Sequence, residues 1–361
     1  MKILFIHASA GAGHLKAAEA LYLTSQTMPG HEAVFVDALD LCSTFYKKSY
    51  RKTYAVLISN LPSIWGMAFA LLDIPWLQLL IRRFRRLYNW INARKVQEYM
   101  QREKFDAIVS THFMPTEISA ALKRKGLIQS KVITVVTDFD VHRIWLAEGV
   151  DYYTAASEWT KKKLISLGIP ENKIVVTGIP TNEKFSAQPD IAELKRSLGL
   201  KEDMFTILMA TGSFGIGPIE QIIEALKGFQ VIVVCGHNKN LFKRLSRKQY
   251  DGVKVCGLVD NMHELMAVSD AMITKPGGLS ISEALVSQLP MIFFNAIPGQ
   301  ETNNIKVLRE HGIGISDCTI DEMVQEVQKL QSSKDAFLTA LKRTKQLARP
   351  TAVRDILALL S

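Results

Sequence analysis

The stretch KILFIHASAGAGH, residues 2–14, decides the class of fold that the chain must follow. A short apolar run leads into a turn of small residues and then into a helical pattern that continues to Leu23. This order is typical of the first strand, glycine turn and first helix of a parallel sheet. Similar apolar runs recur, mostly with helix-like stretches between them, at 33–36, 107–110, 132–137, 152–155 and 174–177. The alternation predicts an α/β fold with a doubly wound parallel sheet.

The same pattern starts again after a polar stretch that ends near Gly199 and that we interpret as a linker. A strand at 205–210 runs into a second glycine loop, TGSFGIG at 211–217. Further strands are expected at 231–235, 253–256, 271–274 and 291–294. We therefore expect two Rossmann-like domains, 1–182 and 200–335, facing each other across a cleft. Helices in 336–361 could pack back on the N-terminal domain.

Composition excludes several classes of protein. With 48% hydrophobic and 22% charged residues, the chain has the balance of a globular protein and not of a disordered one. Its four cysteines lie far apart without a CxxC pair, which argues against a disulfide framework or a zinc site and fits a reducing compartment. The N-terminus lacks the pattern of a signal peptide, so a cytosolic location is expected.

The basic charge is concentrated in one segment that does not fit the strand and helix alternation. Between Tyr46 and Lys104 twelve Lys or Arg face three acidic residues, a difference equal to the whole net charge of +9. Pro62 and Pro75 cut this insertion, about 46–104, into pieces too short to span a bilayer, which needs roughly 20 apolar residues.

From Leu77 to Ile91 the apolar residues of the insertion follow one helical face. A basic amphipathic helix with interfacial aromatic residues is typical of a protein bound to an anionic membrane surface. The residues expected to contact the membrane are Trp76, Arg82, Arg83, Arg85, Arg86 and Trp90. An ordinary helix packed on the core with a solvated Arg face is the alternative. Nucleic-acid binding is disfavoured, because no nucleic-acid motif accompanies the basic face.

The two glycine turns suit a ligand that carries negative charge. Gly11 and Gly13 precede His14 at a helix N-terminus, where an anion or a developing negative charge is favoured, although the G-x-G-x-x-G spacing of dinucleotide sites is missing. His14 could act as a base, or cap and pack the helix. The second loop is the better cradle for a pyrophosphate and comprises Gly212, Ser213, Phe214 and Gly215 among its residues.

Two later loops carry groups that can bind the hydroxyls of a sugar. The stretch TKPGGLSISEA, 274–284, places Gly277 and Gly278 at a turn before a helix whose Glu283 could accept both hydroxyls of a ribose. The stretch PGQETNN, 298–304, is dense in groups that bind sugar hydroxyls. Capping and turn formation would explain either loop alone, but the two in order, each after a strand, favour a binding role.

The motifs together resemble those of the family-28 glycosyltransferases of the GT-B fold. The resemblance is closest to the processive diacylglycerol β-glucosyltransferases and the monogalactosyldiacylglycerol synthases, and it covers nearly the whole chain. It rests on GAGH at 11–14, TDF at 137–139 with His142 and Trp145, GIP at 178–180, VCGHN at 234–238, KPGG at 275–278 and PGQE at 298–301.

The resemblance implies that the C-terminal half binds a UDP-sugar. Leu258 and Val259 would meet uracil through their backbone, Glu283 the ribose, and residues 213–215 the phosphates. Gln300 and Glu301 would hold the donor sugar, with Asn304 close by.

The resemblance also implies that the N-terminal half binds the lipid acceptor. His14 would be the base, and Asp138 the second candidate or the partner that orients a histidine. Gly11, Gly13, His142 and Trp145 would line the acceptor side.

These implications lead to one expected reaction and several rivals. We expect an inverting enzyme at the cytoplasmic face of the membrane that transfers a hexose from UDP-glucose, or second from UDP-galactose, to diacylglycerol. Asp138-Phe139-Asp140 has the form of a metal-binding D-x-D, but with glycine turns for the phosphates we expect neither a metal nor a cofactor. The alternatives are a GlcNAc transferase of the peptidoglycan-precursor type, a UDP-sugar epimerase and a non-catalytic UDP-sugar sensor.

Overall fold

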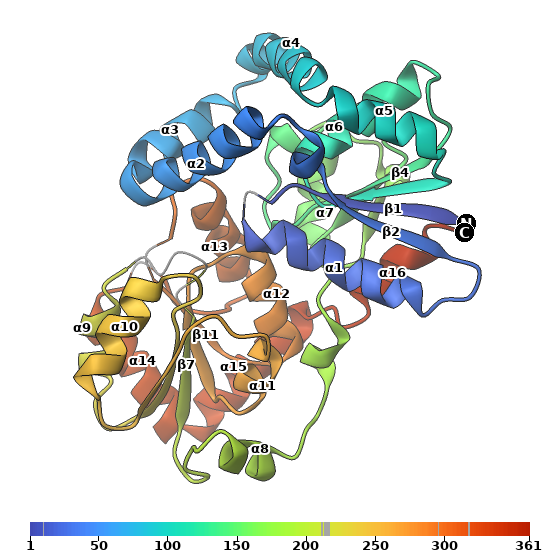
Figure 1. Cartoon of the computed structure of the whole chain (residues 1–361). Helices are drawn as coiled ribbons and strands as arrows, with labels where there is room; N and C mark the ends of the chain where they lie inside the picture. The colour runs from blue at the N-terminus through green and yellow to red at the C-terminus, as the bar shows by residue number, and fades with distance from the viewer. Residues whose placement is uncertain (10, 211, 213–216, 295, 317) are drawn as a thin grey trace. The chain divides into compact units, whose positions relative to one another are not determined.

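The protein is described from a computed structural model of the whole chain (Figure 1). The description covers residues 1–361 apart from 10, 211, 213–216, 295 and 317. It also leaves out the side chains of residues 51, 54, 55, 58, 59, 75, 76, 78–80 and 82 in helices α2 and α4. The backbone divides into unit 1, formed by Met1–Asn182, Ile297–Asn304 and Thr351–Ser361, and unit 2, formed by Glu183–Ala296 and Ile305–Pro350.

Unit 1 is built on a six-stranded parallel sheet in the order β2-β1-β3-β4-β5-β6. Its strands are β1 (Lys2–His7), β2 (Glu32–Asp37), β3 (Ala107–Ser110), β4 (Lys131–Val135), β5 (Tyr152–Ala155) and β6 (Ile174–Val176). The helices that flank the sheet are α1 (Ala12–Gln26), α5 (Arg94–Glu103), α6 (Phe113–Arg124), α7 (Glu158–Ser166) and α16 (Ala352–Ala358). Short 3₁₀ turns occur at η1 (Ala38–Leu41), η2 (Arg143–Trp145) and η3 (Glu171–Lys173).

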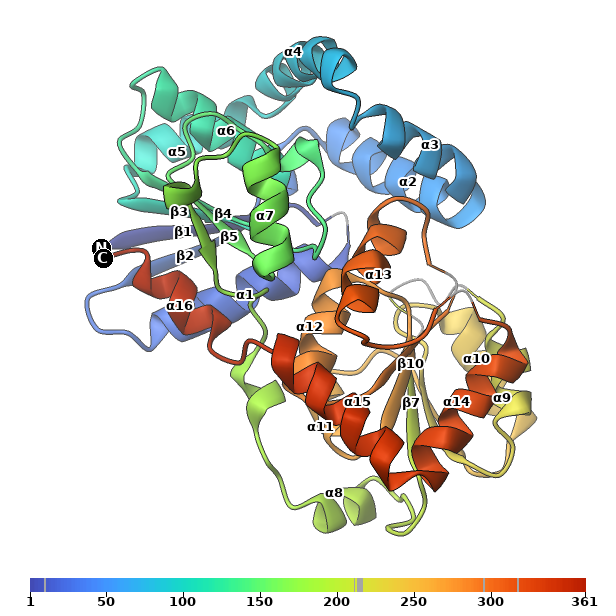
Figure 2. The same cartoon turned by 180° about the vertical axis from the view of Figure 1, so that it is seen from behind.

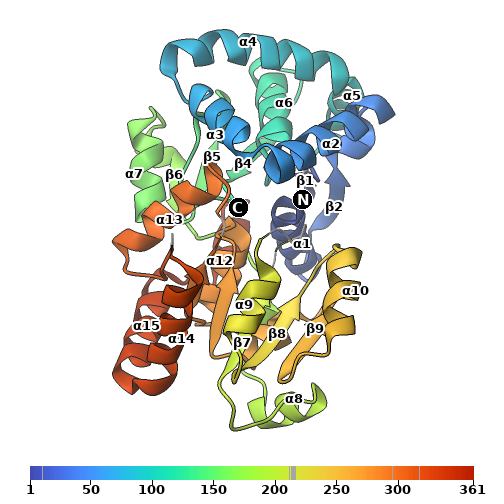
Figure 3. The same ribbon diagram turned by 90° about the vertical axis from the view of Figure 1, so that its left-hand side faces the viewer.

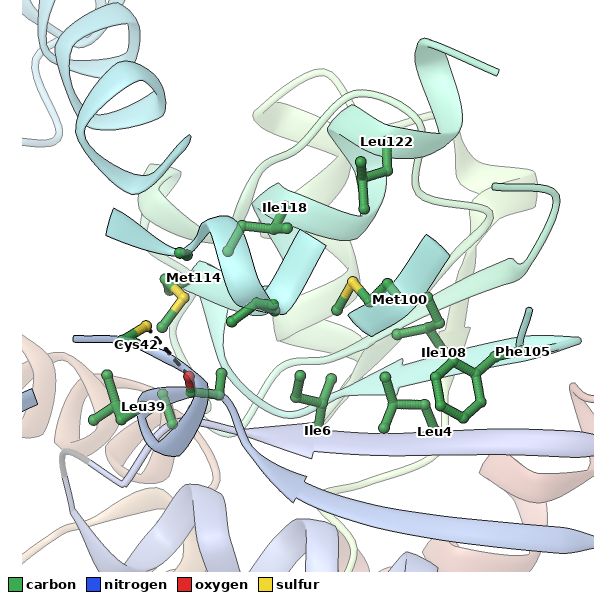
Figure 4. Packing of buried hydrophobic residues seen from close by; sticks show 14 of the residues in the cluster. Leu4, Ile6, Leu39, Cys42, Met100, Phe105, Ile108, Met114, Ile118 and Leu122 are labelled. Atoms are coloured by element: carbon green, nitrogen blue, oxygen red, sulfur yellow. Dashed lines mark hydrogen bonds between the residues drawn. The ribbon is translucent and has the colours of Figure 1, made fainter. Parts of the chain in front are cut away.

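Strand β1 is buried on both faces because consecutive side chains point to opposite sides of the sheet. Leu4 and Ile6 join a core with α5 and α6, which includes Met100 and Ile118 (Figure 4). Ile3 and its neighbours on the other face pack against α1 and α16. Helix α16 lies along α1 (Figure 2), so the C-terminal helix belongs to the core of unit 1.

Three helices, α2 (Thr44–Asn60), α3 (Pro62–Leu71) and α4 (Pro75–Asn92), occupy the connection between β2 and β3 before α5 (Figure 3). Pro62 and Pro75 stand in the first turns of α3 and α4, where the missing N–H costs no helical hydrogen bond. The two prolines therefore divide the apolar stretch into separate helices. Among the described residues, none of the helices combines the length and the apolar character that crossing a membrane requires.

Unit 2 contains a five-stranded parallel sheet in the order β11-β10-β7-β8-β9. Its strands are β7 (Thr206–Ala210), β8 (Gln230–Val234), β9 (Val253–Cys256), β10 (Ala271–Thr274) and β11 (Met291–Phe293). Its helices are α8 (Ile191–Ser197), α9 (Ile219–Ala225), α10 (Lys239–Lys248), α11 (Met262–Ala267), α12 (Gly278–Val286), α14 (Ile320–Ser332) and α15 (Lys334–Leu347). Helix α13 (Gln300–Glu310) begins in unit 1 and ends in unit 2.

The predicted α/β class with two parallel sheets is confirmed, and every strand end lies within two residues of its expected position. The stretch to Gly199, interpreted as a linker, instead forms the 3₁₀ turn η4 (Glu183–Ser186) and α8. Asp190 caps α8 by accepting hydrogen bonds from the N–H groups of Ala192 and Glu193. The C-terminal segment is divided, since α15 belongs to unit 2 and α16 to unit 1.

Candidate active site

In unit 1 the chain leaves β1 for β2 on one side and returns to β3 on the other, which creates a topological switch point between β1 and β3. In open parallel sheets, ligands bind at the carboxyl ends of the strands at such a point. The turn after β1 carries Gly11, Gly13 follows in the first turn of α1, and the residues after β3 are Thr111 and His112. A Cβ added at Gly11 would meet no atom within 4 Å, so the turn leaves space beside its backbone.

His14 lies in the first turn of α1 and is fixed by the turn after β3. Its Nδ1 is 2.7 Å from the carbonyl oxygen of Thr111 and 3.0 Å from Oγ1 of Thr137. Because a carbonyl can only accept, Nδ1 donates its proton there, and Nε2 carries the lone pair. A second hydrogen bond joins the same two residues, because Oγ1 of Thr111 donates to the carbonyl oxygen of His14 at 2.8 Å.

The surroundings of His14 keep its ring neutral. Burial lowers the pKa of His14 to about 4, against a hydrogen bond to Thr111 that raises it. The edge of the ring meets His112 at a centroid distance of 4.7 Å, and Trp145 lies 6.0 Å away. His112 is also kept neutral, because burial lowers its pKa. His14 is nevertheless only partly covered, so its neutral ring keeps a free lone pair on Nε2 near pH 7.

Asp138 follows β4 in the same unit and is almost fully buried. Gln300 Nε2 donates to its Oδ1 at 2.7 Å, and the side chains of Asn304 and Trp145 also form hydrogen bonds with it. Burial raises the pKa of Asp138 to about 6, although these hydrogen bonds lower it. The Thr111 carbonyl orients His14, whereas the hydrogen bonds of Asp138 connect it to Gln300, Asn304 and Trp145.

The three polar residues at the start of α13 have different environments. Gln300 contacts Asp138, whereas the carboxylate of Glu301 accepts a hydrogen bond from the N–H of Ile297 at 2.7 Å. Asn304 was expected beside the donor sugar, but it is completely buried. Its Oδ1 accepts from the N–H groups of Phe139 at 2.9 Å and Asp140 at 3.3 Å. Asn304 therefore fixes the loop after β4.

His142 was expected to line the acceptor side, but the structure gives both of its nitrogens backbone partners. Nδ1 accepts from the N–H of Ile144 at 3.0 Å, and Nε2 donates to the carbonyl oxygen of Phe69 at 2.9 Å. Its side chain thus joins η2 to the end of α3. Trp145 is buried and contacts both His14 and Asp138, so it packs between the two candidate catalytic residues.

Unit 2 has its own switch point, between β7 and β10. The glycine loop after β7 and the turn after β10 therefore start from neighbouring strand ends. Gly212 has a φ of +70°, and a Cβ there would lie 4.0 Å from Cδ of Lys275. Ser213, Phe214 and Gly215, expected at the phosphates, lie outside the described residues.

Helix α12 starts at this switch point. Gly277 is its N-cap, and a Cβ there would meet no atom within 4 Å, while Gly278 is buried in the first turn. Glu283 lies one and a half turns further on and is partly exposed. Leu258 and Val259 follow the edge strand β9, and the Leu258 side chain is 67% exposed. Of the described residues expected to bind the donor, six thus lie at the carboxyl edge of the sheet of unit 2 or on the helix that starts there: Gly212, Leu258, Val259, Gly277, Gly278 and Glu283. Gln300, Glu301 and Asn304 belong to unit 1.

The expectation for the basic residues of α4 is partly wrong, because two of the arginines face the protein. Arg85 donates through Nε and Nη2 to the two oxygens of Glu117 on α6, at 3.1 and 3.2 Å. Arg86 lies 3.6 Å from the same carboxylate, and Glu117 is buried. Trp90, expected at the membrane, packs against the core and under Nζ of Lys125. Arg83 is exposed, while Trp76 and Arg82 lie outside the described side chains.

The opposite face of α4 is apolar and points to solvent. Phe84 is 72% exposed, and Leu87, Tyr88 and Ile91 follow it at helical spacing with exposures of 59%, 47% and 64%. Of the nineteen exposed large hydrophobic side chains among the described residues, ten lie between Phe45 and Ile91. Such a concentration marks an interaction surface.

Two groups that matter here were missed in the sequence. The carbonyl of Thr111 orients His14. Because this is a backbone group, no pattern of side chains in the sequence predicts its position. Glu117 is different, because it is the single carboxylate in the otherwise mostly apolar segment FMPTEISAAL, 113–122. A lone acid on a helix that is otherwise buried signals a buried cationic partner.

Comparison with known proteins identifies the chain. Residues 14–181 match the model of the monogalactosyldiacylglycerol (MGDG) synthase family, and residues 218–356 match the glycosyltransferase family 28 C-terminal domain. A processive diacylglycerol β-glucosyltransferase of Staphylococcus saprophyticus is 31% identical over 92% of this chain and 85% of its own length. A processive diacylglycerol β-glucosyltransferase of Bacillus mycoides is 28% identical over 97% of this chain and 90% of its own length.

The chain belongs to this family of diacylglycerol glycosyltransferases. It is accordingly an enzyme that transfers a glycosyl group, as expected. Solved structures with the same fold include Acinetobacter baumannii MurG, with a TM-score of 0.61 and 13% identity over 99% of both chains. The UDP-GlcNAc 2-epimerase of Neisseria meningitidis has a TM-score of 0.63 and 12% identity over 100% of this chain and 99% of its own. These likenesses confirm the GT-B fold class, which transferases and epimerases share.

Proposed function

We propose that this glycosyltransferase moves glucose from UDP-glucose, or second galactose from UDP-galactose, to the free hydroxyl of diacylglycerol at a membrane surface. The observation that carries the proposal is that unit 1 combines a neutral histidine at its switch point with outward apolar helix faces. A base and a lipid-binding surface are what an enzyme needs to act on an alcohol embedded in a membrane. The names of the relatives support the same acceptor.

In the proposed reaction, Nε2 of His14 removes the proton of the acceptor hydroxyl as its oxygen attacks the anomeric carbon. The new C–O bond forms while the bond from that carbon to the UDP oxygen breaks, and UDP leaves with the electron pair. Attack from the side opposite UDP inverts the configuration and gives a β-linked product. Because Nδ1 donates to Thr111, the imidazole presents its basic nitrogen without a change of tautomer.

The donor would be held mainly by unit 2. The N-terminus of α12 would offer backbone N–H groups to the diphosphate, and Glu283 would offer a carboxylate to the ribose. Gln300 and Glu301 would contact the sugar. Gln300 then links the donor sugar to Asp138 through their hydrogen bond.

Diacylglycerol suits this chain better than an acceptor with a pyrophosphate. A charged acceptor would require cations beside the first glycine turn, where Lys16 is the nearest in sequence. The Lys16 ammonium is exposed and pairs with Glu19 at 2.6 Å. Of the arginines on α4, Arg85 and Arg86 pair with Glu117. A neutral acceptor needs no cation beside the glycine turn, and the apolar surface is sufficient to bind it.

The enzyme would act as a peripheral protein on the cytoplasmic face of an anionic membrane. The apolar row on α4 and the exposed Ile64, Met67 and Leu71 on α3 would enter the interface. Exposed cations beside them, Lys48, Lys52 and Arg83, would face anionic headgroups.

We also propose that no metal takes part. Both carboxylates of the D-x-D sequence have partners: Asp138 accepts from Gln300, and Asp140 accepts from the N–H of Val141 at 3.0 Å. Transfer should therefore proceed unchanged in EDTA. A complete loss that Mn²⁺ restores would contradict this part of the proposal.

Release of UDP is the experiment that tests the proposed class of reaction. The purified protein is incubated with UDP-glucose, UDP-galactose or UDP-GlcNAc and with vesicles that contain or lack diacylglycerol. We expect UDP release that depends on diacylglycerol and is fastest with UDP-glucose. Conversion of the UDP-sugar without UDP release would indicate an epimerase, and donor binding without turnover would indicate a sensor. Release that requires a polyprenyl-pyrophosphate acceptor would indicate a transferase of the peptidoglycan-precursor type.

A further inference from the structure

Helix α3 presents two different faces. Ile64, Met67 and Leu71 are exposed on one side, at the spacing of a helical face. Gly66 and Phe69 lie on the other side and are partly covered. The covered side contacts the loop before α13, residues 297–299, which belongs to the same unit.

The contact between α3 and this loop is too close for side chains at two positions. A Cβ at Gly66 would lie 2.6 Å from Cβ of Pro298. Gly299 has a φ of +93°, and a Cβ there would lie 2.8 Å from Cδ1 of Phe69. Glycine at both positions therefore lets the backbone of α3 and the loop touch, with the Phe69 ring against Gly299.

His142 fixes Phe69 from the side of η2. The rings of Phe69 and His142 have centroids 4.1 Å apart, and Nε2 of His142 donates to the Phe69 carbonyl. That carbonyl is in the last turn of α3, and the N–H of Asp73 donates to Ala70 instead. The histidine thus replaces the missing helical partner, and Phe69 is held between His142 and Gly299.

The loop passes directly into the residues around Asp138. The N–H of Gly299 donates to Oγ1 of Thr302 at 3.0 Å, which fixes the start of α13. The next residue, Gln300, donates to Asp138 at 2.7 Å. A displacement of α3 would consequently move Gly299 and change the Gln300–Asp138 hydrogen bond.

We propose that α3 positions Gln300 for transfer and that a lipid surface on the outer face of α3 sets this position, with Gly66 and Phe69 as positioning residues. This rests on the proposed function and adds that the membrane raises the rate of transfer besides supplying the acceptor. A surface can shift the equilibrium between two positions of α3 only if it binds one of them more tightly. The exposed side chains of α3 supply this difference in affinity, because the apolar area that they bury in lipid depends on the position of the helix.

The test separates activation from acceptor supply. Transfer is measured to dihexanoylglycerol dissolved as monomers, with and without phosphatidylcholine–phosphatidylglycerol vesicles that contain no diacylglycerol. We expect the vesicles to raise kcat of the wild type about tenfold. Gly66→Ala and Phe69→Ala should bind vesicles within about twofold of the wild type and lose the stimulation. Ser63→Ala, an exposed position of the same helix, is the matched control and should keep it.

Hydrogen exchange supplies a readout that needs no activity. In the wild type, the same vesicles should slow exchange of the Ile297 and Gly299 N–H groups, and in Gly66→Ala and Phe69→Ala they should not. If no transfer occurs with or without vesicles, the proposed function fails. The hydrogen-exchange result still decides whether α3 positions the loop before Gln300. Vesicles without effect on both kcat and exchange, or full stimulation in folded Gly66→Ala and Phe69→Ala, would overturn the proposal.

Discussion

Arg85 on α4 forms a two-point ion pair with Glu117 on α6, with side-chain exposures of only 14% and 6%. Asn89 donates to the same carboxylate at 3.0 Å. The polar side of α4 therefore faces the protein, and its apolar row of Phe84, Leu87, Tyr88 and Ile91 is turned outward. This is the reverse of an ordinary surface helix, and it is why unit 1 exposes so much apolar surface.

Loss of Glu117 should destabilise unit 1. Glu117→Ala leaves the guanidinium of Arg85 without its partner in a mostly buried position, and breaking a buried pair in this way costs about 3–5 kcal/mol. Urea denaturation, followed by hydrogen exchange of α4 and α6, measures the loss. The control is Glu98→Ala, which removes the exposed pair with Arg94 and should cost no more than about 1 kcal/mol. Equal effects of the two substitutions would show that the Glu117 pair does not hold α4.

The outward row of α4 should carry the membrane affinity. Burial of a large apolar side chain contributes about 1.5–3 kcal/mol, so Phe84, Leu87 and Ile91 changed together to Ser should lower vesicle affinity by at least about tenfold. Sedimentation with anionic vesicles measures the bound fraction. The same change at Ile165, Phe242 and Leu338, which are also exposed but lie elsewhere, is the control. Unchanged sedimentation of the α4 variant would rule out this face as the docking surface.

The sequence was sufficient for the fold because each strand is a short apolar run followed by a turn of small residues. It also placed an apolar helical face between Leu77 and Ile91. It could not show which side of that helix meets the protein, because the answer depends on Glu117, which lies 26 residues beyond Ile91 on another helix. Periodicity reports that two faces differ, and only a tertiary contact decides which one is buried.

The candidate site was predicted unevenly for a similar reason. His14 and the glycine turns follow strands, so their place at the sheet edge could be derived from topology. The functions of Asn304 and His142 could not, because both side chains bind backbone groups distant in sequence. Asn and His serve equally well as ligands for a sugar and as partners for backbone groups, and the sequence does not separate these uses.

Replacement of His14 should slow transfer without weakening the binding of the UDP donor. A general base contributes about 10²- to 10⁴-fold, so turnover of His14→Ala should fall by that factor while the Kd of UDP changes only a few-fold. Turnover assays and calorimetry with UDP measure the two quantities. His31→Ala, near the other end of α1, is the control and should keep wild-type turnover. Wild-type turnover in His14→Ala would remove this histidine from the mechanism.

The pH dependence should distinguish Asp138 from His14. The raised pKa of Asp138, about 6, means that its carboxylate becomes protonated as the pH falls through 6, whereas the lowered pKa of His14, about 4, keeps that ring neutral over the same range. If transfer needs the Asp138 carboxylate to hold Gln300, kcat/KM should fall below pH 6. In Asp138→Asn this fall should disappear, and the remaining activity should decline only near pH 4. An acid limb near 6 that persists in Asp138→Asn would assign it to another group.

The central claim is that hexose is transferred to diacylglycerol with inversion, and the product itself tests it most directly. Isotopically labelled UDP-glucose is incubated with the protein and diacylglycerol-containing vesicles, and the lipid fraction is separated by chromatography and analysed by mass spectrometry and NMR. We expect labelled glucosyl-diacylglycerol with a β-anomeric coupling constant, formed by the wild type and about 10²- to 10⁴-fold more slowly by His14→Ala. No labelled diacylglycerol product with either UDP-glucose or UDP-galactose, or a product with the α-configuration, would contradict the account.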